Sequence, residues 1–193
     1  MVWSKAGSVN TASSGTVNIL NVSSLPDSKF YMGLFHNSTN GQNASVRMGN
    51  STIETTGNPY RHTAERNGGS GNTPSSANND GIRVNDNAGN TPWFSVMYIA
   101  NISGEDKLLI GSTVELMASG TATNRNKVYG KFAFTSNPID IIQMNSDNMP
   151  SGTNFSMLGS DGVESLNVQD GAVYYETDTN KEYLLYNNTW TEL

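Results

Sequence analysis

WFSVMYIANI, residues 93–102, and KLLIGSTVELM, residues 107–117, are two long, largely apolar stretches near the middle of the sequence. The four residues between them, Ser103-Gly104-Glu105-Asp106, are small or polar and favour a chain reversal. A helix over residues 107–117 is disfavoured, because Gly-Ser-Thr-Val at 111–114 are poor helix formers. The pattern therefore predicts a β-hairpin at the centre of the core.

Shorter strand-like runs surround this hairpin, separated by turns rich in Asn, Ser, Gly and Pro. We expect strands over 2–10, 15–22, 29–36, 44–48, 60–66, 81–85, 127–135, 139–145 and 154–161. The two segments on either side of Asn137-Pro138 are predicted to pair with each other. Many short strands without a helical period predict an all-β fold, an antiparallel jelly-roll-like β-sandwich.

The composition fits an ordered, polar-surfaced β protein. The chain has 193 residues, long enough for one domain with a sizeable core, and is 35% hydrophobic and 15% charged. Its apolar residues cluster in runs rather than being diluted, which disfavours disorder. Because there is no cysteine, disulfides and thiolate metal sites are excluded, so stability must come from β packing and from oligomerisation.

The last two dozen residues predict a separate small meander. Residues 173–175 form a short strand, Asp178–Lys181 turn the chain, residues 182–186 run back, and Thr189 to Leu193 offer a third strand. Such a ribbon has nothing to cover its apolar side chains. We therefore expect a β-sandwich body over 1–165 and a C-terminal hairpin over 166–193 that docks on the body or on a neighbouring chain. The predicted assembly residues are Tyr174, Tyr175, Tyr183, Leu185 and Trp190.

This segment resembles the small C-terminal hairpin of many phage tail-fibre and other virion-surface proteins. The residues that carry the resemblance are Gly171, Tyr174, Tyr175, Thr177, Asp178, Thr179, Asn180, Lys181, Tyr183, Tyr186 and Trp190. The body is similar, without a chemical motif, to β-rich proteins encoded by phages and marine viruses. The resemblance implies a virion component that forms a homo-oligomer, with a trimer favoured as in fibres.

Charge and the N-terminal sequence restrict partners and location. The formal net charge is −6 and the eleven Lys and Arg are scattered, so we expect no nucleic-acid binding. No stretch resembles a signal peptide or approaches the roughly 20 apolar residues of a membrane span. We expect synthesis in a host cytoplasm, incorporation into a virion and no membrane insertion.

Residues that perform catalysis are not apparent. The two histidines, His36 and His62, fall in different predicted strands, and neither lies in a nucleophile motif. Scattered carboxylates are expected on turns and wet strand faces. We therefore expect no enzymatic activity.

Cofactors are likewise not expected, apart from a possible structural Ca²⁺. Asp80, Asp86 and Asp161 are weak candidate ligands, because they provide the hard oxygens that calcium prefers. Asp-Gly pairs are also ordinary turn residues, so the metal stays an open alternative.

Aromatic residues raise the alternative of sugar recognition. Trp93, Tyr60, Tyr186 and Trp190 could stack on a pyranose, with the polar loop over residues 67–92 as a contact surface. Trp93 at the start of an apolar strand is also a natural core residue.

Three hypotheses for the function follow. The first is a non-enzymatic virion structural protein, a capsid decoration or fibre subunit that assembles through β-sandwich and hairpin contacts. The second is a receptor- or carbohydrate-binding module of a viral fibre, with a host-surface glycan as partner. The third is a major capsid jelly-roll protein, which the lack of a basic arm disfavours.

Overall fold

The computed structural model describes residues 3–12, 17–41, 44–66, 73–74, 81–85, 91–116, 123–134, 137–161, 171–187 and 189–193. These residues belong to two compact units, a body over Trp3–Asp161 and a C-terminal unit that begins at Gly162. Within the described ranges every regular element is a β-strand and every strand pair is antiparallel. They contain no helix that is long and apolar enough to cross a membrane. The predicted all-β sandwich is confirmed.

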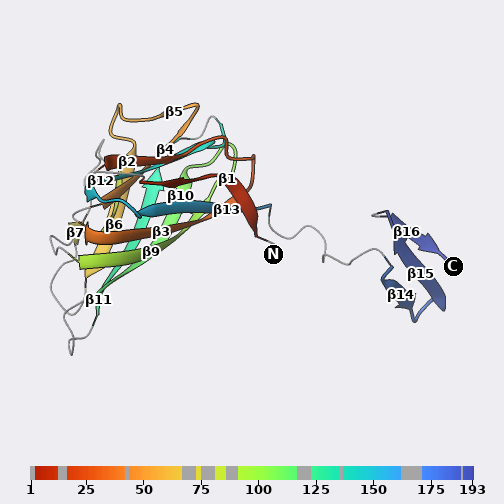
Figure 1. The fold of residues 1–193 in the computed structure, drawn as a ribbon. Helices are drawn as coiled ribbons and strands as arrows, with labels where there is room; N and C mark the ends of the chain where they lie inside the picture. The colour runs from red at the N-terminus through yellow and green to blue at the C-terminus, as the bar shows by residue number, and fades with distance from the viewer. Residues whose placement is uncertain are drawn as a thin grey trace. The chain divides into compact units, whose positions relative to one another are not determined.

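The body is built from nested antiparallel strand pairs, the arrangement of a jelly roll. β1 (Ser4–Thr11) pairs with β13 (Asn154–Ser160), and β2 (Val17–Val22) pairs with β12 (Ile141–Met149). β3 (Phe30–Gly41) pairs with β9 (Thr91–Ala100), and β4 (Ala44–Asn50) pairs with β8 (Ile82–Asn85). The first strand of the body thus lies beside its last strand, and the second lies beside the next-to-last. The strands form two layers (Figure 1).

The two layers differ in size. In the described residues the large sheet has the order β1-β13-β3-β9-β10-β11-β6-β7, and the small sheet has the order β2-β12-β4-β5, with β8 also on β4. The strands that extend the large sheet are β10 (Lys107–Glu115), β11 (Asn124–Phe132), β6 (Tyr60–Arg66) and β7 (Thr73–Pro74). β5 (Thr52–Ile53) is a short edge strand of the small sheet. Since β9 and β10 pair in register from Ala100/Leu108 to Trp93/Glu115, the predicted central hairpin is confirmed.

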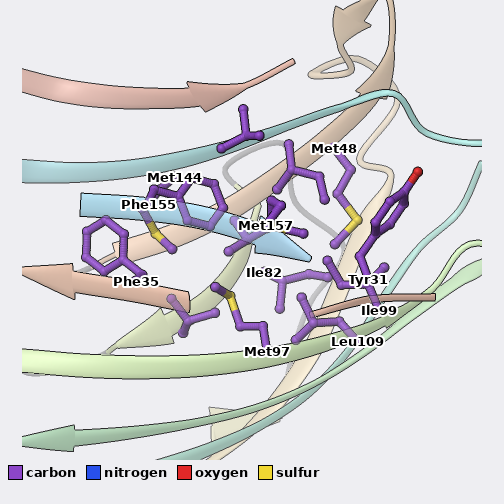
Figure 2. Close-up of a cluster of buried hydrophobic side chains, with 14 of the residues drawn as sticks. Tyr31, Phe35, Met48, Ile82, Met97, Ile99, Leu109, Met144, Phe155 and Met157 are labelled. Carbon is purple, nitrogen blue, oxygen red and sulfur yellow. The ribbon is translucent and has the colours of Figure 1, made fainter. Parts of the chain in front are cut away.

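The core fills the space between the two sheets. Figure 2 shows side chains from both layers meeting there, among them Phe35, Met97 and Leu109 from the large sheet and Met48 and Met144 from the small one. All five are essentially inaccessible to solvent. Several methionines suit such a core, because an unbranched thioether fills irregular gaps between β-branched and aromatic neighbours.

Buried polar side chains tie turns to the core. The Tyr60 hydroxyl accepts a hydrogen bond from the Met48 amide at 2.9 Å and donates to the Glu54 carbonyl at 2.7 Å, while its ring stacks on Phe132. Asn101 donates to the Ser28 carbonyl and accepts from the Ile139 amide at 2.8 Å, which joins three connections at one end of the sandwich. Burial raises the pKa of the Tyr60 hydroxyl to about 12.

One predicted pairing is wrong. The segments around Asn137-Pro138 do not form a hairpin, because β11 pairs with β10 and β6 in the large sheet, whereas β12 pairs with β2 and β4 in the small sheet. The connection crosses from one layer to the other. In a jelly roll, consecutive strands often lie in different sheets, so nearness in sequence does not give pairing.

The C-terminal unit is a three-stranded meander of β14 (Val173–Glu176), β15 (Lys181–Tyr186) and β16 (Thr189–Glu192). Asn180 and Asn187, at its two turns, have φ angles of 53° and 50°, the left-handed backbone that Asn tolerates better than most residues. The predicted strands and turns of this segment are therefore confirmed.

Candidate functional site

The first candidate surface lies on the outer face of the large sheet, the face turned away from the core. Along β10 buried and exposed residues alternate strictly, yet the exposed positions include Leu108, Ile110 and Val114. Seven large apolar side chains on this face or at its edge are between 39% and 60% exposed: Phe94, Tyr98, Leu108, Ile110, Val114, Leu116 and Tyr129. An ordinary antiparallel sheet would carry polar residues there. From here on, the outer face means these seven side chains together with the half-buried Met32, Leu34 and Val96.

Strand register joins these side chains into a continuous row. Ile110 lies directly opposite Tyr98 on β9 and opposite Tyr129 on β11. Tyr98 in turn pairs with Met32 on β3, and Met32 pairs with Leu158 on β13. Five adjacent strands spaced about 4.8 Å apart make the row roughly 19 Å long. Side chains in such pairs touch their neighbours, so the outer face is one patch rather than scattered residues.

Trp3 adds an aromatic ring to this patch from the start of the body. Its ring centroid lies 6.4 Å from that of Tyr98, with the planes tilted by 56°. Aromatic pairs at this distance and tilt attract each other beyond the area they bury. The N-terminal residue of the described chain therefore extends the apolar surface.

Charged residues border the row on the β11 side. Arg125 and Lys127 are exposed on β11, opposite Val114 and Ser112 of β10. Lys131 forms an ion pair with Asp106, with Nζ and Oδ2 2.5 Å apart. An apolar centre with a polar, charged rim is the usual composition of a protein–protein interface.

A shallow depression of about 350 Å³ lies where β9 begins and β10 ends. Its lining includes His36, Phe94, Glu115 and Leu116. Trp93 also contributes, although it is only 2% exposed, and its indole Nε1 has no hydrogen-bond partner among the described residues. Residues 117–122 follow directly and lie outside the described residues, so we assign this depression no role.

The second candidate surface is one face of the C-terminal meander. Tyr174 on β14 lies opposite Tyr183 on β15, and their ring centroids are 6.1 Å apart. Trp190 on β16 stands edge-on to Tyr174, again at 6.1 Å, with an angle of 66° between the planes. Together with Glu176 these three rings line a pocket of about 370 Å³.

Polar groups surround these rings and are held in place. Glu176 Oε2 accepts hydrogen bonds from the Thr179 hydroxyl and from the Tyr183 hydroxyl. Lys181 Nζ donates to Glu192 Oε2 at 2.9 Å, and this bond raises the pKa of the Lys181 ammonium. Partial desolvation and the Glu176 charge raise the pKa of the Tyr183 hydroxyl.

The register splits the predicted assembly residues between the two faces of the meander. Tyr174, Tyr183, Leu185 and Trp190 share one face, with Leu185 buried opposite Trp190. Tyr175 lies on the opposite face, because successive side chains of a strand point to opposite sides. Whether these residues serve in assembly stays a prediction.

The predicted sugar-stacking residues are also dispersed. Tyr60 and Trp93 lie in the core of the body, where neither presents a ring face to solvent, and Trp93 packs on Phe35 with ring centroids 4.7 Å apart. Trp190 and Tyr186 are exposed, but on opposite faces of the meander. Sequence reasoning grouped Tyr174 and Tyr183 with Trp190 only as assembly residues, and it missed Glu176 beside them. The two-residue spacing of Glu176 from Tyr174 along β14 could have shown that they share a face.

Within the described residues, the structure does not bring the two histidines or the candidate metal ligands together. His36 on β3 and His62 on β6 are separated by β9, β10 and β11 in the large sheet. Among the described residues no three His, Asp or Glu side chains are grouped in a way that could hold a metal ion. Asp161 is exposed after β13, whereas Asp80, Asp86 and most of the predicted contact loop over 67–92 lie outside the described residues.

Comparisons with known proteins found no match of this chain to a protein family, to a curated protein or to a solved structure.

Proposed function

We propose that this chain is a non-enzymatic structural subunit of a virion, a capsid decoration or fibre protein, that assembles with further copies of itself through the outer face of the large sheet. The observation that carries the proposal is the apolar row through Met32, Tyr98, Ile110 and Tyr129 on a face that nothing in the described body covers except Trp3. Exposed apolar surface of this extent marks interaction sites on soluble proteins.

The area of the outer face fits a subunit interface. An aromatic side chain has roughly 150–250 Å² of surface and Leu, Ile and Val have less, so the seven side chains at the observed exposures present roughly 600 Å². The largest apolar patch of an ordinary monomer is about 300–600 Å², whereas a standard interface takes about 800 Å² from each partner. The half-buried Met32, Leu34 and Val96 add to the patch. A second copy of this chain is the occupant we propose.

Self-association also accounts for the stability of a chain without disulfides. Burying apolar surface between copies of one chain is a common route to a closed, symmetric oligomer, in which a dimer uses the same patch on both copies and a trimer uses two different parts of the surface on each copy. It stabilises the folded state by an amount that grows with the logarithm of the protein concentration. The resemblance to fibre proteins favours a trimer.

The virion setting rests on the C-terminal segment. Gly171, the 177–181 turn and the aromatic residues that follow are those that resemble the ends of tail-fibre and virion-surface proteins. The face of the meander with Val173, Tyr175 and Tyr186 is highly exposed, and Glu182, opposite Tyr175, lies at its edge. We propose that this face docks on a neighbouring surface during assembly.

Two matched isoleucines test the proposed interface. Ile110 on the outer face is 57% exposed and Ile19 on β2 of the small sheet is 48% exposed. Ile110→Lys should convert the oligomer to monomer, because it places a charge in the middle of an apolar interface, whereas Ile19→Lys should leave the oligomer unchanged. Sedimentation velocity of both variants and the unmodified chain measures this. If the two variants sediment alike, the outer face is not the interface between copies.

The docking role of the meander has its own test. Deletion of residues 170–193 should reduce incorporation into virus particles, as measured by the amount of the protein in purified virions. A truncated chain that is incorporated as well as the full chain would show that the meander does not dock. Gene neighbourhood among head or tail genes would distinguish capsid decoration from a fibre subunit.

A further inference from the structure

The ring-lined pocket of the C-terminal meander is a feature that self-assembly does not explain. Its three rings come from three different strands, and the meander exposes them instead of covering them: Tyr174 is 52% exposed and Trp190 is 43% exposed. Burial of Leu185, which lies on the same face, does not require three large aromatic residues. Rings that stay accessible in a defined arrangement indicate a ligand site.

The arrangement of the rings forms an open corner of molecular size. Tyr174 and Trp190 meet edge to face, and Tyr183 is tilted by 32° to Tyr174. The pocket of about 370 Å³ lies near the lower end of the range for small-molecule sites, about 300–1,000 Å³. Its walls are mostly aromatic, so a ligand must present an apolar face to them.

The rim of the pocket offers both hydrogen-bond acceptors and a donor. The Glu176 carboxylate is oriented by bonds from Thr179 and Tyr183, and the Lys181–Glu192 pair lies on the same face. Groups whose positions are already fixed lose little entropy when they bind a ligand. Such a rim suits a ligand that has several hydroxyls around an apolar face.

Charge narrows the class of ligand further. Residues 171–193 contain the carboxylates Glu176, Asp178, Glu182 and Glu192 and the single cation Lys181, which gives a net side-chain charge of −3. Phosphorylated, sulfated or sialylated ligands would be repelled. Lys181 and Glu192 neutralise each other on the pocket face, and the Glu176 carboxylate is already bonded to two hydroxyl groups. Hydroxyl donors therefore suit this rim, and we choose a neutral ligand, with a quaternary ammonium as the competing outcome of the test below.

We infer that the face formed by Tyr174, Tyr183 and Trp190, with Glu176 at its edge, binds a neutral hexopyranose. One face of such a sugar consists of C–H groups that pack on an aromatic ring, and its hydroxyls donate to Glu176 or Glu192. The site lies entirely within one meander, so it does not depend on the proposed oligomer interface of the body.

Saturation-transfer difference NMR on the full chain tests this inference, with the methyl glycosides of glucose, galactose and mannose as probes. At least one should bind, with a Kd on the order of 1 mM, as expected for one sugar on a shallow site. Trp190→Ala should weaken binding about tenfold or more, since it removes one wall. Tyr186→Ala, which removes an exposed ring from the opposite face of the same meander, should leave binding unchanged.

Several outcomes would overturn the inference. The first is that none of the three glycosides shows saturation transfer. The second is that Trp190→Ala and Tyr186→Ala weaken glycoside binding equally. The third is that the pocket binds tetramethylammonium and not the glycosides. Sedimentation of the same Trp190→Ala protein separates this test from the assembly proposal. If that variant loses both the sugar and the oligomer, the rings serve assembly and the sugar site is wrong.

Discussion

The two faces of the β9–β10 hairpin are both apolar, but the described residues of the body cover only one of them. Leu109 faces the small sheet and is 1% exposed, whereas its neighbour Leu108 faces outward and is 55% exposed. The same contrast holds between Met97 and Tyr98 on β9. Strands that are apolar on both sides are normally buried on both sides. Association with another copy, as proposed above, would bury the face of these strands that the described body leaves exposed.

Substitutions on the two faces should have very different consequences for folding. Leu109→Ala should lower the free energy of unfolding by about 2–5 kcal/mol, because it removes a buried side chain and leaves a cavity. Leu108→Ala should change the unfolding of the subunit by no more than about 0.5 kcal/mol and act mainly on association. Urea unfolding at one low protein concentration compares them. Similar losses for both leucines would show that the outer face is already covered within one chain.

Removing a buried hydroxyl on the inner side should have an intermediate effect. Tyr60→Phe leaves the Met48 amide and the Glu54 carbonyl without this partner and should cost about 1–3 kcal/mol. The outward-facing Tyr129→Phe is the matched control, since Tyr129 is half exposed and should cost much less. Thermal unfolding of the two variants measures the difference. A Tyr60→Phe protein as stable as the unmodified chain would contradict the assigned hydrogen bonds.

The buried tyrosines also predict a loss of stability in alkaline solution. Burial raises the pKa of Tyr31 and of Tyr60 from 10.0 to about 12, so the folded state holds these protons more tightly than the unfolded state. Their contribution is therefore fully present below pH 10 and is lost as the pH rises toward 12. Tyr60→Phe should reduce this alkaline decline. Stability that is unchanged between pH 9 and pH 12 would show that neither hydroxyl is buried as described.

Much of the fold follows from the sequence because alternation and turn chemistry act locally. The hairpin around Ser103–Asp106 and the meander turns at Asn180 and Asn187 were predicted from residues close to each other in the chain. The pairing of β12 with β2 and β4 was not, since it joins residues more than ninety positions apart. Jelly-roll pairing depends on how the layers fold over each other, which no local pattern specifies.

The candidate surfaces were predicted less completely, for a related reason. The apolar runs at 93–102 and 107–117 indicate core strands, but they do not reveal that every second residue is left at the surface. The outer row only appears once register places Tyr98, Ile110 and Tyr129 side by side. Trp93 and Tyr60 illustrate the opposite case, because they were candidates for an exposed sugar site but lie in the core. The sequence alone does not show whether an aromatic side chain is buried.

The smallest effect is expected at the rim of the outer face. Asp106→Asn removes the partner of Lys131 but should change the free energy of subunit unfolding by less than about 1 kcal/mol, because both side chains are partly exposed. The effect should shrink further in high salt. Urea unfolding at low and high ionic strength measures it. A loss as large as that of Leu109→Ala would mean that the rim, and not the apolar centre, dominates this region.

Sedimentation equilibrium of the unmodified chain tests the central claim most directly. With a chain mass of 20.8 kDa, an outer face buried between copies predicts a mass that is a multiple of this value, about threefold for the favoured trimer, at micromolar concentrations. A mass that stays at 20.8 kDa across the whole accessible concentration range would contradict it.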